Sequence, residues 1–366
     1  MTDETYMRRA LLAGRRMRGA TAENPSVGCV IVSNDQIVAV ASTAPDGRPH
    51  AETTALAQAG EAARGATAYV TLEPCCHHGR TPPCTEALIA AGVARVVTAI
   101  EDPDPRVSGA GHSALRAAGI EVASGVLADA AAWELRGFLS RIVRQRSYVT
   151  LKLACSRDGK IAMKPGEPTA ITGEVARGRV HLLRARADAI LVGVSTVLAD
   201  DPDLTCRLPG MQNRSPVRIV SDSRLSIPLA SRLVRTAGEV PVWVMTTSAA
   251  DPDARSALLA SGVRVIDCQA TPDGKVDLSD MLHTLARENL SHVLAEGGAH
   301  MARALMEADL VDEAWLLQAP HTIGPQGLDA MAGLPLDTIR ASSAFRQRGE
   351  SEKLGPDWLA KYVRVR

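Results

Sequence analysis

Strand and helix signals alternate along almost the whole chain, in two series separated by the polar stretch RQRSY at 144–148. Repeated alternation of this kind predicts α/β domains, in which helices cover the faces of a sheet. A hairpin is expected where Ser33, Asn34 and Asp35 join two apolar runs. In the first series we expect helices at 4–18, 50–60, 85–92, 112–118 and 129–144, and strands at 27–32, 36–42, 66–74, 95–100 and 120–126.

The second series begins with an expected strand at 148–156, so we place a domain boundary near residue 146. A length of 366 residues agrees with about two domains of roughly 150 residues each. Further strands are expected at 189–195, 217–223, 240–247, 263–269, 291–298 and 312–320, and helices at 174–187, 253–261, 278–289 and 299–308.

Composition excludes several classes of function. The chain carries 41 Lys and Arg against 41 Asp and Glu, which argues against a basic surface for nucleic acid or anionic membranes. It has only 2 Phe, 4 Trp and 4 Tyr, too few for a binder that stacks single-stranded bases. No apolar run reaches the ~18–20 residues that span a bilayer, and the N-terminal segment has no apolar signal core. These observations predict a cytoplasmic protein with no membrane partner.

Three of the seven cysteines, Cys75, Cys76 and Cys84, lie within ten residues of one another. The cytosol keeps thiols reduced, so this cluster favours a metal site over a disulfide.

The strongest motif is His50-Ala51-Glu52, followed by Pro74-Cys75 and then by Cys84. One histidine and two cysteines supply three zinc ligands, and a catalytic zinc keeps its fourth position open for water. A nearby carboxylate that does not bind the metal, here Glu52, can move the protons of a deamination. Zinc deaminases carry His-x-Glu followed by Pro-Cys-x-x-Cys, whereas eight residues separate the two cysteines here.

Two other interpretations of this motif stay open. Cys76 competes with Cys75 as the ligand, although Cys75 is the one that follows a proline. The cysteines could also form a structural zinc site with His77 or His78, but such a site gives no reason for Glu52.

The second half has no Gly-x-Gly-x-x-Gly fingerprint. Instead, Glu296-Gly297-Gly298 forms a predicted turn between a strand and a helix, where free backbone N–H groups can bind phosphate. Arg184 and Arg207 can each donate two parallel hydrogen bonds to a phosphate, and surface ion pairs are the alternative for both.

Segments in both halves resemble the bifunctional riboflavin-biosynthesis deaminase/reductase family. The resemblance implies a cytidine-deaminase-like three-layer domain at 1–146, followed by a dihydrofolate-reductase-like α/β domain at 147–366. The segments are AENPSVGCVIV, HAET, VTLEPCCHHGRTPPCTEALI and EDPDPRVSGAG in the first half, and LKLACSRDGKIA, ILVGVSTVLADDPDLTCR, IVSDS and VLAEGGAHMARAL in the second.

The resemblance also implies residue roles in the first half. Zinc would be held by His50, Cys75 and Cys84, with Glu52 as the proton donor and acceptor. Pyrimidine and ribose-phosphate contacts would come from Asn24, His77 and Arg80.

In the second half the resemblance implies an NADPH site and a substrate site. Many relatives have Ser and Trp where this chain has Pro168 and Ala170, and this difference puts their substrate contacts in doubt. The implied NADPH contacts are Ala154, Thr196, Asp200, Ser223, Gly298, Ala299, His300, Met301, Ala302, Arg303 and Ala304. The implied substrate contacts are Pro168, Ala170, Arg184, Leu204, Arg207 and Glu296.

The expected function is thus two steps of riboflavin biosynthesis on phosphoribosyl-pyrimidines, a zinc-dependent deamination and an NADPH-dependent reduction, in a homodimer joined through the reductase domain. Three alternatives compete with it: an active deaminase with a degenerate reductase domain, a nucleic-acid deaminase and a structural zinc scaffold.

Overall fold

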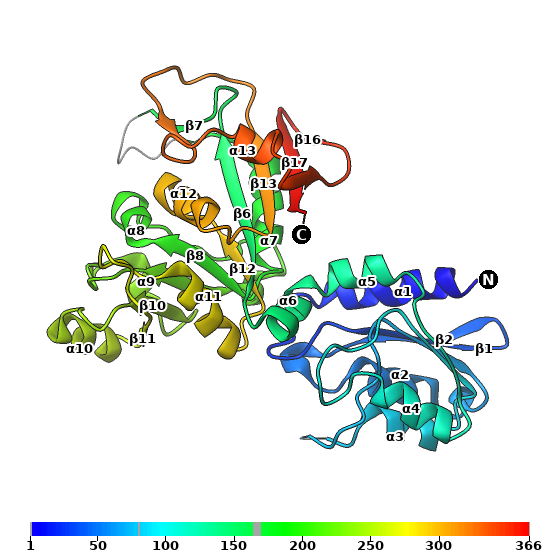
Figure 1. Cartoon of the computed structure of the whole chain (residues 1–366). Coiled ribbons are helices and arrows are strands. Elements are labelled where there is room, and N and C mark those ends of the chain that lie inside the picture. The colour runs from blue at the N-terminus through cyan, green and yellow to red at the C-terminus, as the bar shows by residue number, and fades with distance from the viewer. Residues whose placement is uncertain (1, 80, 164–169, 366) are drawn as a thin grey trace. The chain divides into compact units, whose positions relative to one another are not determined.

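The computed structural model describes residues 2–79, 81–163 and 170–365, and the chain divides into two compact units, Met1–Gln145 and Arg146–Arg366. Figure 1 shows the elements of each unit, which are described separately below. In the described residues, no helix has the length and apolar character needed to cross a membrane.

The first unit is built on a five-stranded sheet in the order β2-β1-β3-β4-β5. Strand β1 is antiparallel to β2 and β3, whereas β3, β4 and β5 are parallel. The expected hairpin is confirmed, and Asn34 and Asp35 both take positive φ angles, as tight hairpin turns require. The strands are β1 (Gly28–Ser33), β2 (Gln36–Ser42), β3 (Thr67–Val70), β4 (Arg95–Thr98) and β5 (Glu121–Ala123).

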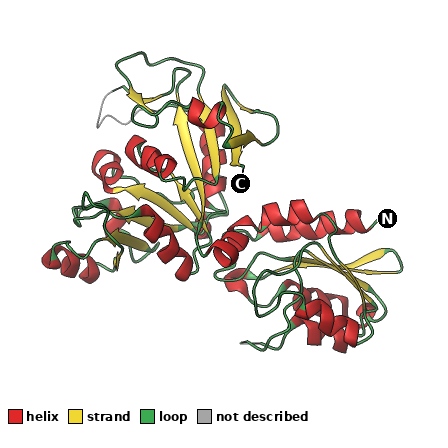
Figure 2. Ribbon diagram, in the orientation of Figure 1, coloured by secondary structure: helices red, strands yellow, loops and turns green. Residues whose placement is uncertain are grey.

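Helices cover both faces of this sheet, which confirms the expected three layers (Figure 2). Tyr6 and Met7 of α1 and Ala131 of α5 pack on one face, while Ala55 of α2 and Leu88 of α3 pack on the other. The helices are α1 (Asp3–Arg16), α2 (Ala51–Ala59), α3 (Cys84–Ala90), α4 (Ala110–Ala117), α5 (Ala128–Glu134) and α6 (Arg136–Arg144), with short 3₁₀ turns at Pro45–Gly47 and Gly60–Ala63.

The single helix expected at 129–144 is wrong. Two helices occupy this range, because Leu135 has a non-helical ψ of 7° and divides α5 from α6.

The second unit contains a ten-stranded sheet with the path β11-β10-β9-β8-β12-β6-β13-β17-β15, and β16 pairs with β17. The strands from β11 to β13 along this path are parallel, so their carboxyl ends lie at one edge of the sheet. The strands are β6 (Tyr148–Cys155), β8 (Ala189–Gly193), β9 (Val217–Ser221), β10 (Val242–Thr246), β11 (Arg264–Asp267), β12 (His292–Ala295), β13 (Glu313–Gln318), β15 (Phe345–Gln347), β16 (Glu352–Leu354) and β17 (Asp357–Arg364).

Both faces of this sheet are also buried. Successive residues of β8 show it, because Ala189 and Leu191 belong to one hydrophobic core while Ile190 and Val192 belong to another. The remaining elements are α7 (Glu174–Arg184), α8 (Val194–Asp200), α9 (Arg232–Arg235), α10 (Pro252–Ala260), α11 (Leu278–Arg287), α12 (Ala299–Glu307), α13 (Asp337–Arg340), a 3₁₀ turn at Gln212–Arg214, and the two-stranded pair of β7 (Lys160–Ala162) and β14 (Leu328–Asp329).

Candidate active sites

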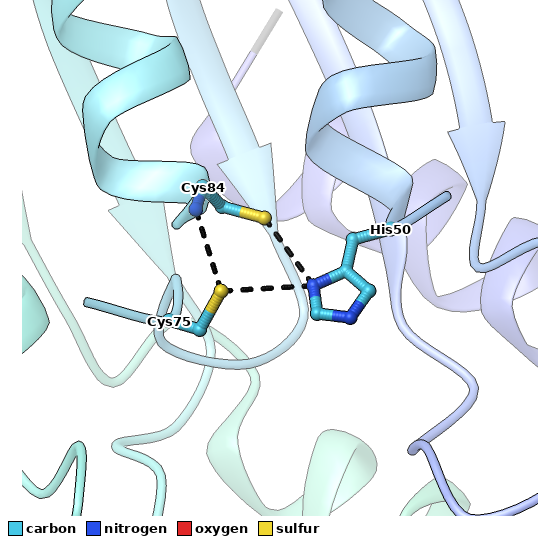
Figure 3. Close-up of side chains that lie close together, drawn as sticks. All are labelled: His50, Cys75 and Cys84. Atoms are coloured by element: carbon cyan, nitrogen blue, oxygen red, sulfur yellow. Dashed lines mark hydrogen bonds between the residues drawn. The ribbon is translucent and has the colours of Figure 1, made fainter. Parts of the chain in front are cut away.

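Three segments of the first unit bring His50, Cys75 and Cys84 together (Figure 3). His50 directly precedes α2, Cys75 lies in the loop after β3, and Cys84 is the first residue of α3. The Nδ1 atom of His50 lies 3.6 Å from Cys75 Sγ and 3.4 Å from Cys84 Sγ.

These separations fit a tetrahedral zinc ion. With usual Zn–S and Zn–N bond lengths, the sulfur and nitrogen ligands of one tetrahedron lie about 3.6 Å apart. One imidazole nitrogen and two sulfurs are also the donor types that zinc favours. The cluster therefore offers three ligands, and Cys76 is outside it, since its Sγ contacts the backbone oxygen of Arg106 at 3.7 Å.

Cys75 Sγ accepts the Cys84 backbone N–H at 3.3 Å, and the two cysteine side chains also interact with each other. Hydrogen bonding from Cys84 and the neighbouring His50 lower the pKa of Cys75 to about 4, against the opposing effect of burial. The same interaction raises the pKa of the Cys84 thiol. One thiolate is thus favoured by the protein alone, and a bound cation would favour ionisation of both.

Glu73 holds the loop that carries Cys75. Its buried carboxylate accepts backbone N–H groups from Asp102, Gly109 and His112 at 2.9–3.2 Å. Glu73, Glu101 and His112 also meet the spacing of a metal cluster, but these hydrogen bonds already occupy the Glu73 oxygens. This cluster therefore organises the loop.

Glu52 lies in the first turn of α2 with only 4% of its surface exposed. Burial, together with the nearby Cys75 sulfur, raises the pKa of Glu52 to about 7. A carboxyl group with a pKa near neutrality both accepts and donates protons readily, as a general acid–base requires.

Four buried nitrogen atoms near the cluster have no hydrogen-bond partner among the residues that the structure describes: Asn24 Nδ2, Arg48 Nε, His50 Nε2 and His77 Nδ1. Buried polar atoms almost always have a partner, so this concentration indicates a place for a polar ligand. Asn24 and His77 are predicted substrate contacts, whereas no sequence motif singled out Arg48. Arg80 lies outside the described residues.

In the second unit, predicted residues gather at the carboxyl edge of the parallel strands. Ala154 lies near the end of β6, Thr196 follows β8, Ser223 follows β9, and Glu296 follows β12. Ligands of open α/β sheets bind at this edge.

Glu296 is the centre of a buried charge network. Arg184 donates to both carboxylate oxygens, from Nε at 2.8 Å and from Nη2 at 3.0 Å, and Lys152 Nζ lies 3.6 Å away. Burial opposes ionisation, but the charges of Arg184 and Lys152 outweigh it and hold the pKa of Glu296 at about 2. The sequence analysis missed Lys152, although a lysine within an otherwise apolar strand was the available signal.

The other predicted substrate contacts differ in accessibility. Leu204 has its side chain in the hydrophobic core, so only its backbone can meet a ligand. Arg207 is exposed and lies 3.5 Å from Asp203, while its backbone N–H donates to His181. Ala170 is exposed, and Pro168 lies outside the described residues.

The glycine turn before α12 is closely packed. A Cβ atom on Gly297 would lie 2.7 Å from Met301 Cβ, and the Gly298 N–H donates to Thr196 Oγ1 at 3.1 Å. The predicted NADPH contacts along α12 differ in their accessibility to a ligand. Ala302 lies in the hydrophobic core and Arg303 pairs with Glu307, whereas His300 is exposed.

Two predicted NADPH contacts, Asp200 and Ser223, lie beyond the ends of β8 and β9. Asp200, at the end of α8, exposes much of its surface. The part of its carboxyl group that is covered by protein raises its pKa. Ser223 Oγ accepts the Val276 N–H at 3.0 Å.

Comparisons with known proteins match both halves. The family of the "Cytidine and deoxycytidylate deaminase zinc-binding region" matches residues 1–100, and that of the "RibD C-terminal domain" matches residues 147–359. "Riboflavin biosynthesis protein RibD" of Escherichia coli is 42% identical over 98% of either chain.

Two solved structures are similar over nearly their full length. The RibD structure of Acinetobacter baumannii has a TM-score of 0.89 at 37% identity, covering 100% of this chain and 99% of that one. A deaminase/reductase structure from Thermotoga maritima has a TM-score of 0.85 at 32% identity, covering 99% of either chain.

Proposed function

Because the chain belongs to the RibD family of riboflavin-biosynthesis enzymes, we propose that its two halves divide the two reactions of that family between them. The chain is a zinc-dependent deaminase and an NADPH-dependent reductase. It deaminates diaminohydroxyphosphoribosylaminopyrimidine and then reduces 5-amino-6-(5-phosphoribosylamino)uracil. Residues 1–146 carry out the first reaction, and residues 147–366 carry out the second.

In the first half, His50, Cys75 and Cys84 hold the zinc ion. When bound, zinc would act as a Lewis acid that lowers the pKa of water and so makes it nucleophilic at neutral pH. Glu52 would accept a proton from the attacking water and deliver it to the ring nitrogen. It would then move the remaining hydroxyl proton to the amino group, which leaves as ammonia as the carbonyl forms. Asn24 binds the pyrimidine, while His77 and Arg80 bind the ribose phosphate. The convergence of the three ligands beside the buried Glu52 is the observation that carries this proposal.

In the second half, the carboxyl edge of the sheet binds NADPH and the deaminated product. NADPH supplies the hydride that reduces the anomeric carbon of the opened ribose. Glu296 orients Arg184 and Lys152, whose charges suit a sugar phosphate. Arg207 adds a guanidinium at the rim, and the backbone of the Gly298 turn approaches the cofactor phosphates.

Two assays on the purified full chain test the division. Ammonia release from the pyrimidine should depend on zinc, and NADPH oxidation should depend on the deaminated intermediate but not on zinc. Intact ammonia release without NADPH oxidation would favour a degenerate reductase domain, the alternative motivated by Ala170. NADPH oxidation that depends on zinc would contradict the division.

The quaternary structure and compartment are also proposals. We propose a homodimer joined through the reductase half and a cytoplasmic location. Light scattering of the full chain and of a variant that ends at residue 146 tests the dimer, because only the full chain should show twice its chain mass.

A further inference from the structure

Arg48 is a charged residue of the first unit that neither the metal cluster nor the predicted substrate contacts account for. It lies two residues before His50 and is partly buried. Its Nη1 donates to Thr81 Oγ1 at 2.8 Å. Thr81 belongs to the segment between Cys75 and Cys84, so the guanidinium spans from the start of α2 to the loop that carries the metal ligands.

The Arg48 guanidinium has unused hydrogen-bonding capacity. A guanidinium has five N–H donors, and Arg48 uses one of them on Thr81. Its Nε is buried without a partner, and no carboxylate lies within ion-pair distance of it in the described ranges 2–79, 81–163 and 170–365. A partly buried cation with free donors favours an anionic ligand.

The surroundings of Arg48 restrict what that ligand can be. Gly47 packs against Asn24, since a Cβ atom on Gly47 would lie 2.3 Å from Asn24 Nδ2. On the other side, Arg48 Nη2 lies 3.7 Å from the place of a Cβ atom on Gly79, in the same loop as His77. The guanidinium thus lies against the loop that carries His77, and the residue before Arg48 packs against Asn24.

We propose that Arg48 is a further substrate-binding residue of the deaminase, whose guanidinium binds the phosphate of the phosphoribosyl group and selects phosphorylated pyrimidines. The inference rests on the proposed function of the first half. A dianionic phosphate would take up donors that the protein leaves free, and a guanidinium presents them in a matching fork. Asn24 and Glu52 would serve the ring at the other end of the substrate.

The competing explanation is that Arg48 only fastens the loop through Thr81. Arg48→Met removes the charge and keeps most of the stem, Arg48→Lys keeps the charge without the fork, and Thr81→Val removes the fastening hydroxyl alone. Arg8→Gln is the matched control, because Arg8 is an exposed arginine of α1 that pairs with Glu4.

The test measures ammonia release, zinc content and the binding of ribose 5-phosphate by titration calorimetry, fitted with one binding event for each half of the chain. In Arg48→Met, KM for the phosphoribosyl pyrimidine should rise roughly ten- to a hundred-fold with kcat nearly unchanged, the usual effect of losing a charged hydrogen bond. Zinc content should stay at one per chain. Ribose 5-phosphate should bind correspondingly more weakly, Arg48→Lys should be intermediate, and Thr81→Val and Arg8→Gln should resemble wild type.

Equal losses in Thr81→Val and Arg48→Met, or a fall in kcat at unchanged KM, would overturn the proposal in favour of a loop fastener. So would a titration of Arg48→Met in which both ribose 5-phosphate binding events keep their wild-type affinities. If the wild-type chain released no ammonia, the proposed function would fail, and the calorimetry would still decide whether Arg48 binds phosphate.

Discussion

The two candidate sites differ in how their buried polar groups are satisfied. Around the cluster of His50, Cys75 and Cys84, four buried nitrogens have no partner within the described part of the chain. At the carboxyl edge of the second unit, Glu296 is instead paired with Arg184 and Lys152.

This difference has a consequence for stability. Buried polar groups without partners lower the free energy of unfolding, so replacing them should reduce activity and leave stability equal or higher. A buried ion pair behaves in the opposite way, because removal of one partner leaves an uncompensated charge. Variants of the first site should therefore lose function while folded, whereas variants of the second should also lose stability.

The largest expected effect concerns the two adjacent cysteines. Cys75→Ser should remove zinc and reduce ammonia release to background, because the cluster loses a thiolate ligand. Cys76→Ser is the matched control and should retain both, since Cys76 Sγ contacts a backbone oxygen outside the cluster. Zinc content and the rate of ammonia release are measured for both variants. Loss of zinc from Cys76→Ser alone would reverse the ligand assignment.

Glu52→Gln should lower ammonia release roughly 10²- to 10⁴-fold, the usual contribution of a general acid–base. Zinc content should remain, and thermal stability should be equal or higher because a buried carboxylate is removed. NADPH oxidation by the same preparation is the internal control and should not change. A variant with wild-type ammonia release would show that Glu52 has no role in proton transfer.

Arg184→Met should destabilise the second unit by about 3–5 kcal/mol, because it leaves Glu296 buried beside Lys152 alone. Arg207→Met is the matched control, and a change within about 0.5 kcal/mol is expected for this exposed side chain. Denaturant unfolding of the full chain compares them. Similar unfolding curves for both variants would contradict the contrast between the two sites.

The smallest expected effect is a pH dependence of unfolding. The pKa of Glu296 is lowered in the folded chain to about 2 from 4.5. Its stabilising contribution is therefore complete above about pH 4.5 and is lost as the pH falls through 2, amounting to roughly 3 kcal/mol. Unfolding measured across this range should show the loss in wild type and a flatter profile in Glu296→Gln. Identical slopes would exclude the ion pair as its source.

Some elements could be predicted because their determinants are local. The hairpin at 33–35 follows from polar turn residues between apolar runs, and α2 and α3 coincide with the helices expected at 50–60 and 85–92. The break at Leu135 was missed because leucine is a good helix former and no proline marks the end of α5.

Long-range pairing accounts for what the sequence analysis missed. Lys152 and Glu296 are 144 positions apart, and they meet because β6 and β12 are neighbouring parallel strands. Arg48 and Thr81 are 33 positions apart, and they meet because the loop between Cys75 and Cys84 returns to the start of α2. Neither pair has a local sequence pattern.

The sequence by itself determined the alternation of strands and helices and singled out His50, Glu52, Cys75 and Cys84 as one motif, because motif spacing is a property of nearby residues. Only the tertiary structure decided which charges are neutralised and which are left without partners. That difference depends on contacts between distant segments, and it separates the satisfied Glu296 network from the unfilled polar groups around His50.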